Sequence, residues 1–178
     1  MKRNSAEGKL EKKRAALLER TAAALGVELD EARQLLSIER QQSIRLNPLR
    51  AATELTLGEL HQLGWHGSSY DWAPDCCSAG GKLTEIKNSE LVSSGKLYIQ
   101  NAASWLPVVI LDPQPGERIL DVCAAPGGKT THISAMSNGE ERITANDNSR
   151  ARLMRLQAVC RQLNAAIEHY TLFDARML

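Results

Sequence analysis

A loop of small residues in the second half of the chain has the residue types of a ligand-binding loop. Residues 120–133 read LDVCAAPGGKTTHI, and Gly127-Gly128-Lys129-Thr130 resembles the end of a phosphate-binding loop. The full motif, G-x-x-x-x-G-K-[ST], fails because Cys123 stands where its first glycine is needed. The dinucleotide motif G-x-G-x-x-G fails as well, because Ala124-Ala125-Pro126 occupy its place. What remains of the two motifs is a loop of small residues, which lets a ligand approach the backbone closely, and a helix N-terminus with free N–H groups.

Two aspartates extend this candidate site. Asp147 follows Gly128 by 19 residues, at the end of an expected strand, where a carboxylate can accept hydrogen bonds from ribose hydroxyls. Asp174 ends a further expected strand and could accept a hydrogen bond from an adenine amino group. Carboxylates repel phosphates, so a nucleoside without phosphates, such as S-adenosylmethionine, fits better than a nucleotide. The alternative is that Asp121 and Asp147 are ordinary strand-end or capping residues and that the glycine pair is an ordinary turn.

The elements around the loop predict how these residues come together. We expect strands over 117–123, 142–146 and 167–173, separated by helices over 129–136 and 149–163. This β-α-β-α-β succession is typical of an α/β protein with a parallel, doubly wound sheet. The loop and both aspartates then lie at the carboxyl ends of the strands.

The first half of the chain has a different pattern. We expect a helix over 9–25, ended by Gly26, and a second helix capped by Asp30 that runs to Ile38. Thr56 and Glu59 form a capping-box pattern that starts a helix to about Leu63. The remaining expected elements are a strand over 43–47 and helices over 89–94 and 102–111. We therefore divide the chain into a helical and small α+β region, residues 1–94, and an α/β domain, residues 95–178.

Contact with RNA rests on two local features, because a formal net charge of +1 gives no overall positive field. The basic run Lys9, Lys12, Lys13 and Arg14 could touch RNA, or it could form a solvated helix face. The aromatic side chains in the turn-rich segment 64–81 could stack on bases, or they could fill the core of a small domain.

Composition excludes several classes of protein. The N-terminus is charged and lacks the apolar core of a signal peptide, and no apolar run has the length of a membrane span. The four cysteines and four histidines lack the spacing of a zinc site or of a disulfide framework. We therefore expect a cytoplasmic chain without a metal.

The second half of the chain resembles a known family. GKLYIQNAASWLPVVILDPQPGERILDVCAAPGGKT, then ANDNSRAR and FDAR, within residues 95–176, resemble the Fmu/Sun/Nop2p-type RNA cytosine-5 methyltransferases. A weaker resemblance reaches back through Arg45-Leu46-Asn47. The resemblance implies a Rossmann-like class I methyltransferase fold, S-adenosylmethionine as cofactor, and ribosomal or transfer RNA as substrate. It implies that Asp147 holds the ribose, that Asp174 lies near the adenine and that Arg152 supports the site. The implied cofactor loop consists of Cys123, Ala124, Ala125, Pro126, Gly127, Gly128 and Lys129.

Part of the family pattern is missing. The family attacks cytosine with a cysteine thiolate carried in D-A-P-C and T-C motifs, and neither motif occurs in this sequence. We therefore assign no catalytic residue. Only the first three strands of the family's sheet are expected, which leaves an apolar, unpaired edge on the first. Two hypotheses follow: a methyltransferase that is complete only with a missing C-terminal half, or a noncatalytic RNA- or cofactor-binding remnant of such an enzyme.

Overall fold

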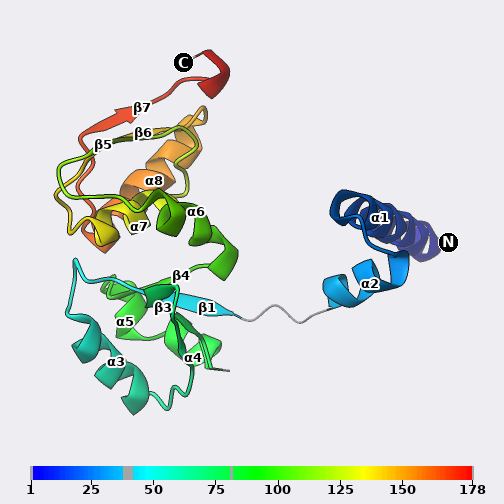
Figure 1. Ribbon diagram of the computed structural model, residues 1–178, viewed down its shortest axis with the longest axis horizontal. Coiled ribbons are helices and arrows are strands. Elements are labelled where there is room, and N and C mark those ends of the chain that lie inside the picture. The colour runs from blue at the N-terminus through cyan, green and yellow to red at the C-terminus, as the bar shows by residue number, and fades with distance from the viewer. Residues whose placement is uncertain (1, 38–41, 81, 178) are drawn as a thin grey trace. The chain divides into compact units, whose positions relative to one another are not determined.

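A computed structural model of the chain describes residues 2–37, 42–80 and 82–177. The chain separates into two compact units, Met1–Arg40 and Gln41–Leu178 (Figure 1). None of the described helices is long and apolar enough to cross a membrane.

The first unit is a pair of helices, α1 (Lys2–Leu25) and α2 (Leu29–Ser37). Gly26 lies between them with φ of +67°, a conformation that glycine adopts without strain. Both helices were predicted. The predicted cap was wrong, because α2 begins at Leu29 and Asp30 therefore lies inside its first turn. An acidic side chain there still interacts favourably with the helix dipole. The predicted end of this helix at Ile38 lies outside the described residues.

The second unit begins with a small antiparallel sheet of order β2-β3-β1-β4. Its strands are β1 (Ser43–Leu46), β2 (Ser69–Tyr70), β3 (Ala73–Ser78) and β4 (Leu97–Ile99), and its helices are α3 (Thr53–Gln62), α4 (Leu83–Lys87) and α5 (Glu90–Ser93). Every residue of β1 is buried, because strands pair on both of its sides. Apolar side chains of these strands and helices form one core.

Three features of this region can be compared with the prediction. The turn-rich segment folds into β2 and β3, and its Trp65 belongs to the core, so the core interpretation is correct for this side chain. Strand β4 lies beyond residue 94 yet pairs with β1, so the small sheet extends past the predicted boundary. The predicted capping box was wrong: α3 already begins at Thr53, and the Thr56 hydroxyl donates to the Ala52 carbonyl instead.

A parallel three-stranded sheet follows, with order β5-β6-β7. The strands β5 (Arg118–Asp121), β6 (Arg142–Asn146) and β7 (His169–Thr171) alternate with α7 (Gly128–Met136) and α8 (Arg150–Leu163). A short 3-10 helix η1 (Ala102–Ser104) and α6 (Leu106–Leu111) precede them, and η2 (Ala175–Met177) follows. The predicted β-α-β-α-β succession and Rossmann-like α/β class are confirmed. In Figure 1, β5, β6 and β7 lie side by side, with α7 and α8 packed against them.

Strand β5 forms one edge of this sheet within the described residues, since it pairs with β6 alone. Its Leu120 is 52% exposed, and Val122 just beyond it is 41% exposed. The expected apolar edge is therefore present on the first strand.

Candidate cofactor-binding site

The loop between β5 and α7 is held at both ends by Asp121. One carboxylate oxygen accepts from the backbone N–H of Cys123 at 3.3 Å, and the other accepts from the Thr130 hydroxyl at 2.8 Å. The Ala124 N–H also donates to the carbonyl of Asn146, at 2.8 Å. Asp121 is thus a strand-end residue that organises the loop, while the Cys123, Pro126 and Lys129 side chains remain exposed.

The glycine pair lets this loop pack closely against its neighbours. Gly127 has φ of +116°, and a Cβ there would lie 3.1 Å from the Leu156 side chain and 3.2 Å from that of Val159, both on α8. A Cβ on Gly128 would lie 3.2 Å from the Gln100 amide nitrogen, just beyond β4. The two glycines therefore have a packing role at the start of α7. Their small size also keeps the loop backbone close to the sheet.

Asp147 lies at the end of β6 and is linked to the loop through Arg152. Its carboxylate is 2% exposed, accepts from the Ser149 N–H at 3.0 Å, and lies 3.3 Å from a guanidinium nitrogen of Arg152. The same Arg152 nitrogen donates to the Ala125 carbonyl at 2.7 Å. The structure thus brings Asp147, Arg152 and the loop together. Asp147 also has the strand-end role that the alternative interpretation gave it.

Asn146, which the sequence analysis did not single out, connects the ends of all three strands. Its amide nitrogen donates to the carbonyls of Val122 and Phe173, both at 3.0 Å. Its amide oxygen accepts from the Thr171 hydroxyl and the Phe173 N–H, both at 2.9 Å. With no exposed surface, this side chain fixes the carboxyl edge of the sheet. Its only signal in the sequence is its position directly before Asp147.

Asp174 follows β7 and is engaged by a neighbouring cation. Its carboxylate oxygen accepts from Arg176 Nε at 3.0 Å, and this hydrogen bond lowers the pKa of Asp174. The described contacts do not join Asp174 to the loop or to Asp147. A ligand that bound Asp174 would have to share it with Arg176.

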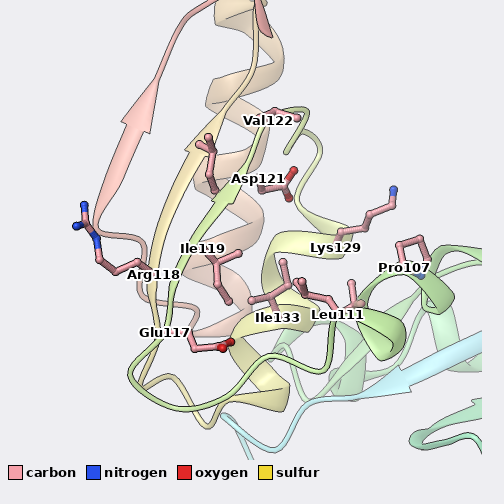
Figure 2. Close-up of a pocket in the computed structure, with 11 residues that line it drawn as sticks. Pro107, Leu111, Glu117, Arg118, Ile119, Asp121, Val122, Lys129 and Ile133 are labelled. Atoms are coloured by element: carbon pink, nitrogen blue, oxygen red, sulfur yellow. The ribbon is translucent and has the colours of Figure 1, made fainter. Parts of the chain in front are cut away.

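A cavity of about 590 Å³ lies beside β5, between this strand, α6 and α7 (Figure 2). Ile119, Leu111 and Ile133 point toward one another in it, and Asp121, Val122 and Lys129 lie at the carboxyl end of the strand. Among the ten predicted site residues, only Lys129 lines this cavity. The cavity therefore adjoins the loop but lies along the open edge of β5 rather than beside Asp147. The described residues contain no group of side chains suited to a metal ion.

Known proteins match this arrangement. The family model for the 16S rRNA methyltransferase RsmB/F matches residues 108–178, which include the loop, Asp147 and Asp174. The ribosomal RNA small subunit methyltransferase F of Pectobacterium atrosepticum is 37% identical over 146 residues, 77% of this chain and 29% of that protein. Its counterpart in Shewanella amazonensis is 32% identical over 145 residues, 76% of this chain and 30% of that protein.

This chain is similar to the RsmB/F methyltransferase family, whose model matches its residues 108–178. It spans about 30% of the length of the relatives that it matches.

Solved structures are similar to this chain as well. The crystal structure of PH0851 superposes with a TM-score of 0.77 at 32% identity, over 90% of this chain and 36% of that one. The structure of NSun6 from Pyrococcus horikoshii, with SFG, shares the fold, with a TM-score of 0.75 at 18% identity over 90% of this chain and 65% of that one. The similarity in fold therefore extends beyond the residues that the family model matches.

Proposed function

We propose that this chain is the cofactor-binding, N-terminal part of an S-adenosylmethionine-dependent RNA cytosine-C5 methyltransferase that acts on ribosomal or transfer RNA. The observation that carries the proposal is the junction of Asp147, Arg152 and Ala125 at the carboxyl ends of β5 and β6. In open α/β sheets, ligands bind outside these carboxyl ends. A protein that modifies ribosomal RNA acts where ribosomes are assembled, so the proposal includes a cytoplasmic location.

The residues at this edge fit S-adenosylmethionine better than a nucleotide. Asp147 supplies an acceptor for the ribose hydroxyls, and Asp174 supplies one for the adenine amino group. The first N–H groups of α7 and the exposed ammonium of Lys129 suit the carboxylate at the methionine end. When bound, the cofactor would supply an electrophilic methyl group. The remaining loop residues, Cys123 to Gly128, would keep the backbone close to it.

No described cysteine fits the role of the nucleophile. Burial raises the pKa of the Cys76 thiol to about 12, and it also raises those of Cys77 and Cys160. A catalytic cysteine needs a thiolate, which burial disfavours. Cys123 is exposed, but it lies in the proposed cofactor loop. The proposal therefore assigns the catalytic cysteines to a C-terminal part of the enzyme. The same observation favours the second candidate, a noncatalytic RNA- or cofactor-binding remnant.

One labelling experiment tests both aspects of the proposal. The 178-residue chain is incubated with RNA and with S-adenosylmethionine that carries tritium on its methyl group. We expect the chain to retain the cofactor on a filter and to transfer no tritium to cytosine C5. Transfer by this chain would refute its inactivity, and loss of transfer in Cys123→Ser would then identify Cys123 as the nucleophile. Displacement of the label by an equal concentration of ATP would refute the choice of cofactor.

A further inference from the structure

Arg45 lies in β1, an inner strand of the small sheet, and is a charged side chain with 1% of its surface exposed. None of the described carboxylates forms an ion pair with it, and its Nε and Nη1 have no hydrogen-bond partner among the described residues. The ring of Tyr98, its cross-strand neighbour in β4, lies 5.6 Å away. Burying a guanidinium without a carboxylate is costly. Stability of the small sheet therefore does not explain why this position holds an arginine.

Within the described part of the chain, the one hydrogen bond of the Arg45 side chain leads to the loop. Its Nη2 donates to the Thr131 hydroxyl at 2.8 Å, and that hydroxyl donates to the Gly127 carbonyl at 2.8 Å. Both Thr131 and Gly127 belong to the start of α7, and Thr131 is 1% exposed. Because the hydroxyl has a single proton, the donation from Arg45 fixes its orientation toward Gly127.

Further contacts join the small sheet to the same turn. Gly128 packs against Tyr98, which lies in β4, and against Gln100, which follows it. Next to Thr131, His132 is buried and neutral, because burial and the charge of Arg45 both lower its pKa, to about 3. Arg45, rather than His132, is therefore the cation next to the first turn of α7, which it contacts through Thr131.

We infer that Arg45 is a positioning residue for the cofactor loop, which it holds through Thr131 and the Gly127 carbonyl. Through Arg45, the small sheet would then fix the conformation in which the N–H groups of the cofactor loop bind a ligand. This inference rests on the proposed binding of S-adenosylmethionine.

Thr131→Val tests the inference, because it keeps the shape of the side chain and removes the hydroxyl. Thr56→Val is a matched control: Thr56 is also fully buried in a helix and donates to the carbonyl four residues earlier, but among the described residues it forms no hydrogen bond with Arg45 or with the loop. We expect both variants to lower the melting temperature of the 178-residue chain by similar amounts. The dissociation constant for S-adenosylmethionine should rise about tenfold or more in Thr131→Val alone. Thr131→Ser, which restores the hydroxyl, should bind as the wild type does.

Equal dissociation constants for the two valine variants would overturn the inference. Should Thr131→Val not fold, Arg45→Lys replaces it, since lysine keeps the charge but not the geometry of the hydrogen bond. A wild-type dissociation constant in that variant would then overturn the inference. Hydrogen exchange of the amides of residues 128–131, measured without cofactor, separates this result from a failure of the proposed function. Faster exchange in Thr131→Val than in Thr56→Val supports the positioning role, and equal exchange contradicts it, even if the wild type binds no S-adenosylmethionine.

Discussion

His132, on α7, is 3% exposed, and burial together with nearby Arg45 lowers its pKa from 6.5 to about 3. The unfolded chain therefore takes up a proton below pH 6.5 that the folded chain does not take up. The contribution of His132 to the free energy of unfolding is therefore fully present above pH 6.5 and is lost as the pH drops toward 3. Between pH 7 and pH 5, we expect the free energy of unfolding to fall by about 1–2 kcal/mol from this group. Urea unfolding at pH 7, 6 and 5 measures the change.

His132→Gln should remove this pH dependence, because glutamine does not titrate. His169→Gln is the control: this histidine lies in β7 and is exposed, so the variant should keep the loss of stability. An identical slope against pH in the wild type and in His132→Gln would contradict the assignment.

At the residue scale, the sequence indicated the residues of the proposed cofactor site but not the residues that support them. Spacing indicated the loop and Asp147, and the structure joins these two through Arg152. Asn146 and Arg45 escaped prediction, because their roles depend on strand ends and on a sheet that come together only in the fold. The packing of Gly127 against α8 could not be predicted from the sequence for the same reason.

The start of α7 offers a test at the scale of an element. Gly127→Ala would place a Cβ 3.1 Å from Leu156 in a backbone with φ of +116°, so it combines strain with a clash. We expect the free energy of unfolding to fall by at least about 2 kcal/mol. Gly58→Ala, inside α3 with nothing within 4 Å of the added Cβ, should instead raise it by about 0.5–1 kcal/mol. Urea unfolding of both variants measures the difference, and a neutral Gly127→Ala would show that the loop relaxes freely.

Long periodic segments explain why the β-α-β-α-β half was predictable. Strand β5 contains Ile119 and Leu120, β6 contains Ile143 and Ala145, and the helix α8 between β6 and β7 spans 14 residues. Strands β2 and β4 have only two and three residues and form the two edges of their sheet, and the partner of β4, strand β1, is distant in sequence. The capping box at Thr56 failed because α3 starts one turn earlier, which places the threonine in the helix interior.

For the whole molecule, the open edge of β5 predicts self-association. Leu120 and Val122 are 52% and 41% exposed beside a strand that pairs on one side within the described residues. Such edges pair with other chains. We expect the 178-residue chain to form oligomers in size-exclusion chromatography with light scattering, and to become monomeric when co-expressed with the C-terminal part of the proposed enzyme.

Leu120→Lys should reduce this association, because a charge on an edge strand opposes pairing. Leu55→Lys is a suitable control, since Leu55 is 66% exposed but lies on α3. A sharp monomer peak for the wild type, with strongly protected amides in residues 119–123, would show that the three-stranded sheet is sufficient by itself.

Calorimetric titration of S-adenosylmethionine into the wild type, Asp147→Asn and Asp75→Asn tests the central claim most directly. Asparagine keeps an acceptor for the Ser149 N–H but removes the charge that the ribose hydroxyls would meet. Asp75 is a matched aspartate on β3 that accepts from the Thr53 hydroxyl. We predict a loss of about 1.5–3 kcal/mol in binding free energy for Asp147→Asn and no change for Asp75→Asn. Equal affinities in all three proteins, or tighter binding of ATP than of S-adenosylmethionine, would contradict the account.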